Sequence, residues 1–134
     1  MLVIVAPGQG AQVPGFLSPW LELPGMAPRF EAWSEVAGLD LVRYGTTADA
    51  DEIRDTAVAQ PLLVSAGLAT ATALLGSLSG PEAPLPANGS FVDAVAGHSV
   101  GEFTAAALAG VLTPNDALAL VAERGRGMAE AASR

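Results

Sequence analysis

The sequence contains neither cysteine nor lysine, and it has a single histidine. Without cysteine the chain has no disulfide, thiolate metal ligand or cysteine nucleophile. One histidine also excludes a multi-histidine metal site built from this chain alone. The six basic residues, all arginine, are outnumbered by 14 acidic residues, which gives a net charge of −8. Binding to nucleic acid or to an anionic membrane needs a basic surface that these residues do not supply.

Signals for secretion or membrane insertion are also weak. No basic region precedes the apolar residues 2–6, so no signal peptide is expected and a cytoplasmic location is the default. Residues 56–81 form a long uncharged stretch, but Gln60, Pro61 and several glycine, serine and threonine residues interrupt it. This content favours a buried helix of a soluble protein over a lipid-facing span.

Short apolar runs and turn residues predict an α/β fold. Residues 2–6 are wholly apolar, which is typical of a strand buried on both faces of a parallel sheet, and residues 91–96 predict a second strand. Residues 79–90 are rich in proline and glycine and predict a surface loop. Helices are expected over residues 28–37, 49–54, 60–78, 102–109 and from 114 towards the last residue. Two strands are too few for a doubly wound sheet, so we expect residues 1–134 to be the N-terminal part of a larger unit.

The segment Gly97, His98, Ser99, Val100, Gly101 lies between a predicted strand and a predicted helix, as a nucleophile elbow requires. The two glycines leave room for a sharp turn that exposes the Ser99 hydroxyl and frees the Val100 N–H to bind an oxyanion. The alternative is an ordinary strand-to-helix turn with a capping serine. His98 is adjacent to Ser99, but neighbouring side chains in an elbow diverge. We therefore expect His98 to orient the turn and the general base to lie beyond Arg134.

A second glycine-rich loop, Gly8 to Gln12, follows the first strand. A dinucleotide-binding loop would have a third glycine where this chain has Val13, so that interpretation is poor. The loop is better explained as the source of a second oxyanion donor, the backbone N–H of Gln9. A plain glycine-rich turn remains the alternative.

Arg124 is the most informative charge. At 100° per residue it falls within an apolar stripe of the last helix, whereas Arg126 falls on the opposite face. That predicted stripe consists of Ala117, Leu120, Val121, Met128 and Ala131. An arginine on a buried face needs an anionic partner. From spacing alone the partner is either a structural carboxylate, such as Glu102, Asp93 or one outside this chain, or the carboxylate of a substrate.

Four motifs together resemble the malonyl-CoA:acyl-carrier-protein transacylase family, whose motifs also occur in the acyltransferase domains of polyketide and fatty-acid synthases. They occur in the family's order and spacing and span nearly the whole chain. The motifs are Pro7-Gly8-Gln9-Gly10-Ala11-Gln12, Ala59-Gln60-Pro61, Gly97-His98-Ser99-Val100-Gly101-Glu102 and Arg124-Gly125-Arg126-Gly127-Met128.

The resemblance implies a ping-pong transfer. Ser99 would accept malonyl from malonyl-CoA as an ester and pass it to the phosphopantetheine thiol of an acyl carrier protein, for fatty-acid or polyketide synthesis. The N–H groups of Gln9 and Val100 would form the oxyanion hole. Arg124 would bind the malonyl carboxylate, and Gln60 would line the site, although Gln60 could equally serve as a hydrogen-bonding residue near a helix N-terminus. The resemblance implies no bound cofactor and no metal.

The resemblance also implies that this chain is only the N-terminal segment of the large subdomain of an α/β-hydrolase-like acyltransferase. The histidine base, a small ferredoxin-like subdomain and the rest of the large subdomain would come after Arg134, either in the same chain or as a separate chain. The initial methionine favours a stand-alone enzyme over a synthase module. Val100 is weakly more typical of malonyl-using than of methylmalonyl-using members. Two alternatives remain: a serine hydrolase such as a thioesterase, and a non-catalytic interaction domain.

Overall fold

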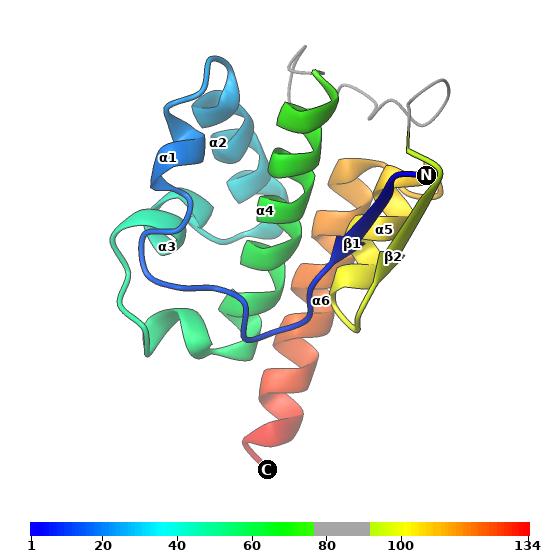
Figure 1. The fold of residues 1–134 in the computed structure, drawn as a ribbon. Coiled ribbons are helices and arrows are strands. Elements are labelled where there is room, and N and C mark those ends of the chain that lie inside the picture. The colour runs from blue at the N-terminus through cyan, green and yellow to red at the C-terminus, as the bar shows by residue number, and fades with distance from the viewer. Residues whose placement is uncertain (77–91) are drawn as a thin grey trace.

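The computed structural model describes residues 1–76 and 92–134 as two short strands and a set of helices (Figure 1). In chain order these are β1 (Val3–Ala6), α1 (Ser18–Leu21), α2 (Met26–Ala37), α3 (Leu41–Thr46), the 3₁₀ turn η1 (Glu52–Arg54), α4 (Thr56–Leu75), β2 (Ala94–Gly97), α5 (Gly101–Leu108) and α6 (Pro114–Ala132). The predicted loop over residues 79–90 and the predicted strand start at Phe91 lie outside the described residues.

β1 and β2 pair in parallel, as the α/β prediction requires. Val3 lies opposite Ala94 and Ala6 lies opposite Gly97. Because the strands run in the same direction, the loop after β1 and the turn into α5 emerge at one edge of the sheet. That edge brings together the two glycine-rich segments that are far apart in the sequence.

The prediction that residues 2–6 are buried on both faces is wrong for the described residues. Ile4 and Ala6 point towards the helices, but Val3 is 41% exposed and Val5 is 72% exposed. The reason is that α5 packs against one face of this two-stranded sheet, and no element in the described ranges covers the other. The apolar side chains on the open face therefore remain in contact with solvent.

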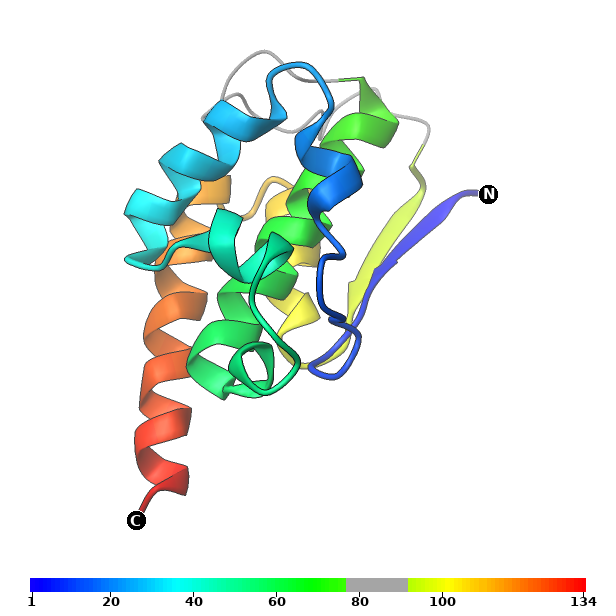
Figure 2. The same ribbon diagram turned by 90° about the vertical axis from the view of Figure 1, so that its left-hand side faces the viewer.

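α4 runs through the middle of the molecule, with α1, α2 and α3 on one side and the strands and α5 on the other (Figures 1 and 2). It starts at Thr56, earlier than predicted, because the Asp55 side chain accepts the Ala57 N–H as an N-cap. It ends at Leu75, before the predicted residue 78, because Gly76 adopts a left-handed conformation. α4 is long and apolar enough to cross a membrane, but 72% of its most apolar window is buried within the protein. Burial of this helix was predicted.

Local capping signals placed two other helices correctly. α2 ends at Ala37 because Gly38 is left-handed, and α6 begins at Pro114 because the Thr113 hydroxyl accepts the Asp116 N–H. The predicted helix over residues 49–54 is reduced to η1, and α1 and α3 were not predicted.

The predicted apolar stripe of α6 is partly wrong. Ala117 and Val121 are buried as expected, but Leu120 and Met128 are half-exposed and Ala131 is exposed. The face that packs against α4 is rotated from the predicted one. It consists of Ala117, Leu118, Val121, Ala122 and Gly125. Arg124 therefore lies at the border of the buried face, and Arg126 is exposed, as predicted.

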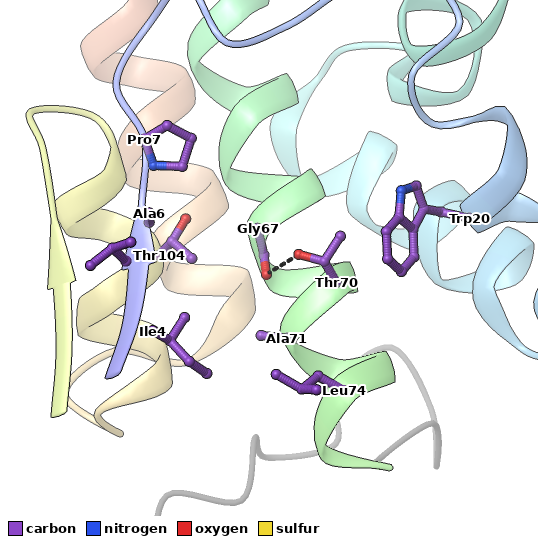
Figure 3. Close-up of a pocket in the computed structure, with 10 residues that line it drawn as sticks. Ile4, Ala6, Pro7, Trp20, Gly67, Thr70, Ala71, Leu74 and Thr104 are labelled. Carbon is purple, nitrogen blue, oxygen red and sulfur yellow. Dashed lines mark hydrogen bonds between the residues drawn. The ribbon is translucent and has the colours of Figure 1, made fainter. Parts of the chain in front are cut away.

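An apolar groove of about 330 Å³ separates β1 from α4. Figure 3 shows Ile4 and Pro7 on the strand side, and Trp20 and Leu74 on the helix side. Ser99 does not line this groove.

The rotated stripe predicts unequal effects of two substitutions in α6. Leu118 is fully buried and Leu120 is 51% exposed. We expect Leu118→Ala to lower the free energy of unfolding by about 2–5 kcal/mol, because it leaves a cavity between α6 and α4. Leu120→Ala should cost much less. Urea unfolding of the two variants measures both values. A larger loss for Leu120→Ala would support the predicted stripe instead, because that stripe contains Leu120 and not Leu118.

Candidate active site

The candidate site forms where the carboxyl ends of β1 and β2 meet α4 and α6. Ser99 comes from the turn after β2, Gln9 from the loop after β1, Gln60 from α4 and Arg124 from α6. The carboxyl edge of a parallel sheet is the usual location of ligand sites in α/β proteins. Four segments that are distant in sequence therefore contribute to one place.

The turn at Ser99 has the strained geometry of a nucleophile elbow. Ser99 has a φ of 54°, and among the described residues it is the only non-glycine residue with a positive φ. The turn is closed by a hydrogen bond of 3.0 Å from the Gly101 N–H to the His98 carbonyl. The serine side chain is exposed rather than used as a helix cap, since the N-terminus of α5 has no side-chain cap. The turn therefore exposes the Ser99 hydroxyl, as a nucleophile elbow does, and Ser99 is not an ordinary helix-capping serine.

Close backbone contacts explain the two glycines of the elbow. A Cβ at Gly97 would lie 2.2 Å from the carbonyl of Gly101, and a Cβ at Gly101 would lie 2.3 Å from the carbonyl oxygen of Ala6. Real Cβ atoms do not approach other atoms this closely, so any side chain at either position would push the turn apart. These distances agree with the prediction that very small residues must flank Ser99.

His98 points away from Ser99 and towards the first loop. Its ring lies against the Gly8 backbone, where a Cβ would come within 2.6 Å of His98 Nδ1. No hydrogen bond joins His98 to Ser99 in the described part of the chain. His98 therefore packs the two loops together, and this geometry does not offer it as a base for Ser99.

Arg124 lies directly beside the candidate nucleophile. Its Nη2 donates to Ser99 Oγ at 3.2 Å, and its Nη1 donates to Gln60 Oε1 at 2.6 Å. Gln60 is 1% exposed, and its Nε2 donates to the Met128 sulfur at 3.2 Å. Gln60 therefore holds the guanidinium rather than bonding the backbone at the start of α4.

The structural carboxylates suggested for Arg124 are engaged elsewhere or not paired with it. Asp93 accepts the Leu2 N–H at 2.6 Å. Glu102 forms no ion pair with Arg124, and none of the ion pairs found within residues 1–76 and 92–134 includes Arg124. A structural pair with Glu102 or Asp93 is therefore wrong. The guanidinium faces the Ser99 hydroxyl with an amide and a hydroxyl as its partners.

Several backbone N–H groups at the elbow and in the first loop have no acceptor in the described part of the chain. They include those of Gln9 and Val100, the two predicted oxyanion donors. Val100 is buried, whereas the loop containing Gln9 is largely exposed. Their roles as donors remain predictions.

The side chains of the first loop were not singled out from the sequence. Gln9 Nε2 donates to the Arg54 carbonyl and to Thr56 Oγ1, each at 3.3 Å. Gln12 Nε2 donates to the Ile53 carbonyl at 3.0 Å. The presence of two glutamines in a loop without regular structure indicates that their side chains could hydrogen-bond to neighbouring segments. The sequence does not show which groups accept these bonds.

This arrangement combines an exposed hydroxyl, free N–H donors and a fixed cation, which suits acyl transfer through a serine ester. The described residues contain no group of three or more histidine, aspartate or glutamate side chains that could hold a metal ion.

The known proteins that this chain resembles in sequence and fold include acyltransferases. Residues 3–134 match the acyl transferase domain family. The malonyl CoA-acyl carrier protein transacylase of Mycobacterium bovis is 51% identical over 133 residues, which are 98% of this chain and 41% of that protein. The crystal structure of MCAT from Mycobacterium tuberculosis, 52% identical, superposes with a TM-score of 0.87 over 99% of this chain and 41% of that one.

A more distant neighbour is a malonyl-transacylase in complex with a type II PKS acyl-carrier protein. It is 31% identical, with a TM-score of 0.80 over 97% of this chain and 39% of that one. The chain thus spans about two-fifths of the length of the relatives it matches. By sequence over nearly all its residues and by fold, the chain belongs to the acyl transferase domain family.

Proposed function

We propose that this chain carries the nucleophile and the carboxylate-binding residue of an enzyme that transfers malonyl from malonyl-CoA to an acyl carrier protein. The observation that carries the proposal is the 3.2 Å contact between Arg124 Nη2 and Ser99 Oγ. In a malonyl ester on Ser99, only the ester carbonyl carbon and one methylene separate Oγ from the carboxylate carbon. A guanidinium in contact with Oγ is therefore within reach of that carboxylate.

In the first half-reaction, Ser99 Oγ attacks the thioester carbonyl carbon and loses its proton to a base. The resulting oxyanion accepts hydrogen bonds from the N–H groups of Gln9 and Val100. The tetrahedral intermediate collapses, the carbon–sulfur bond breaks and coenzyme A leaves as a thiol after protonation. In the second half-reaction, the phosphopantetheine thiol of the carrier protein gives its proton to the base and attacks the ester carbonyl carbon. The bond between that carbon and Oγ then breaks, and the base returns the proton to Ser99 Oγ.

Arg124 gives the site its preference for a carboxylated acyl group. Its guanidinium keeps Gln60 as a partner when it exchanges the Ser99 contact for the malonyl carboxylate. A serine hydrolase acting on neutral acyl groups would have no use for a cation here, so this contact favours the transferase over a thioesterase.

The base belongs to the part of the enzyme outside this chain, because His98 turns towards Gly8. We also propose that this other part completes the α/β-hydrolase-like fold, with a small ferredoxin-like subdomain, in a soluble cytoplasmic enzyme. The open face of β1 and the groove beside α4 are the surfaces available to it. Whether the acyl group enters fatty-acid or polyketide synthesis depends on the carrier protein.

Ser99→Ala tests the nucleophile. In the full-length enzyme that contains this chain, we expect the variant to form no acyl-enzyme and to lose malonyl transfer, because no other hydroxyl occupies the elbow. Intact mass spectrometry after incubation with malonyl-CoA measures the adduct. A malonyl adduct of normal yield on the variant would remove Ser99 from the mechanism.

Arg124→Ala tests the carboxylate contact. Loss of a charge-assisted pair costs on the order of 2–4 kcal/mol, so malonyl transfer should fall by tens- to several-hundred-fold. Acetyl transfer should change little, and Arg124→Lys should recover only part of the loss, because an ammonium cannot form two parallel hydrogen bonds.

Arg126→Ala is the matched control, since Arg126 is exposed on the other face of α6 and pairs with Glu123. It should leave the malonyl-to-acetyl ratio of kcat/KM unchanged. Equal losses of malonyl and acetyl transfer in Arg124→Ala would support a structural role for Arg124 instead.

Residues 1–134 expressed alone should not catalyse transfer, because Ser99 is a weak nucleophile without a base. The exposed edges and faces of the sheet should also make this piece poorly stable. The assay is malonyl transfer from malonyl-CoA to an acyl carrier protein. Turnover near that of a full-length enzyme, abolished by His98→Ala, would contradict both the need for another part and the role given to His98.

A further inference from the structure

The loop that supplies the Gln9 N–H has no regular secondary structure, yet its position must be fixed for that N–H to stabilise an oxyanion. Donors in such a site act only when they are held at hydrogen-bond distance from the developing charge. β1 ends at Ala6, and residues 9 and 10 form an exposed turn. Contacts from side chains or from other elements must therefore hold the turn in place.

One side chain fastens the turn at two points. Gln12 Oε1 accepts the Gly10 N–H at 2.9 Å, and Gln12 Nε2 donates to the Ile53 carbonyl at 3.0 Å. Gln12 is partly buried, and its bond to the Ile53 carbonyl is partly shielded from water, whereas its bond to the Gly10 N–H is exposed. One planar group thus links the peptide between Gln9 and Gly10 to the backbone of η1.

The conformation held in this way is an unusual one. Gly10 has a φ of 114°, which side-chain-bearing residues rarely adopt. A hydrogen bond to its N–H fixes the peptide plane between Gln9 and Gly10. That plane shares the Gln9 Cα with the preceding peptide plane, which carries the Gln9 N–H, so the bond limits the movement of this N–H relative to the elbow. The Gln9 side chain adds two longer contacts of 3.3 Å to the same region, at Arg54 and Thr56.

The anchor itself is held firmly. η1 precedes the N-cap of α4, and Ile53 is buried in the core. Glu52 of η1 forms an ion pair with Arg43 of α3, and the hydrogen bond from Arg43 lowers the pKa of the Glu52 carboxyl. The Ile53 carbonyl is therefore a fixed point for the loop.

We propose that Gln12 is a positioning residue for the oxyanion donor at Gln9, an inference that rests on the proposed acyl transfer. Gln12 acts through the backbone and does not contact the acyl group. By holding the donor in place, Gln12 helps to stabilise the transition states of both half-reactions. This effect does not depend on the malonyl carboxylate.

The test is Gln12→Met in the full-length enzyme, which keeps the side-chain length but removes both hydrogen bonds. Direct loss of an oxyanion donor lowers kcat by about 10²–10³-fold. Displacement of the donor should lower kcat by about 10–100-fold with KM within about twofold. The loss should be the same for malonyl-CoA and acetyl-CoA, unlike that of Arg124→Ala. Gln12→Glu keeps an acceptor for the Gly10 N–H, so its kcat should lie between that of the unsubstituted enzyme and that of Gln12→Met.

Ser34→Ala is the matched control, because Ser34 Oγ makes a similar double bridge far from the site. It donates to the Phe30 carbonyl at 2.7 Å and accepts the Leu41 N–H at 3.0 Å. This variant should lower the melting temperature about as much as Gln12→Met but leave kcat unchanged.

The outcomes separate this inference from the proposed function. If the unsubstituted enzyme acylates Ser99 and Gln12→Met does so at the same rate, the positioning role is wrong and the function stands. The same holds if Gln12→Met affects malonyl transfer alone, or if Ser34→Ala lowers kcat as much. If the unsubstituted enzyme forms no Ser99 ester, the proposed function itself is wrong.

Discussion

The close approach of three backbone segments at the end of β2 is the constraint on which the site depends. Gly97, Gly101 and the Ala6 carbonyl are so near one another that no Cβ fits between them. This contact joins β1 to the start of α5 and forces Ser99 into a positive φ. The same contact brings the loop after β1 next to the serine. The position of the hydroxyl, the direction of the His98 ring and the availability of the Val100 N–H all follow from it.

The region from η1 to the first turns of α4 supports the rest of the site. On one side, the carbonyls of Ile53 and Arg54 hold the loop that contains Gln9. On the other side, Gln60 holds Arg124 against Ser99. The proposed oxyanion donor and the proposed carboxylate-binding cation are therefore anchored to one stretch of about ten residues. Because α4 is buried, the core of the protein sets the distance between the proposed oxyanion hole and the proposed carboxylate-binding cation.

Features with local causes could be predicted from the sequence. The cap at Thr113 and the stop at Gly38 each depend on residues within a few positions, and the strand–turn–helix pattern with its two glycines around Ser99 can also be recognised locally. Features with distant causes could not. The tether from Gln12 to Ile53 spans 41 positions, and α1 and α3 are too short to show a periodic pattern. Alanine and leucine lie on several faces of α6, which made its buried stripe ambiguous. The exposure of Val5 depends on which elements cover the sheet, and a strand's own pattern does not record that.

The proposed roles of Ser99 and Arg124 can be tested with a crystal structure of the full-length protein trapped with malonyl-CoA. We expect a malonyl ester on Ser99 Oγ, with the free carboxylate hydrogen-bonded to the Arg124 guanidinium and with Gln60 still bound to that guanidinium. The ester carbonyl oxygen should face the N–H groups of Gln9 and Val100. An ester on another residue, or a malonyl carboxylate turned away from Arg124, would contradict the account.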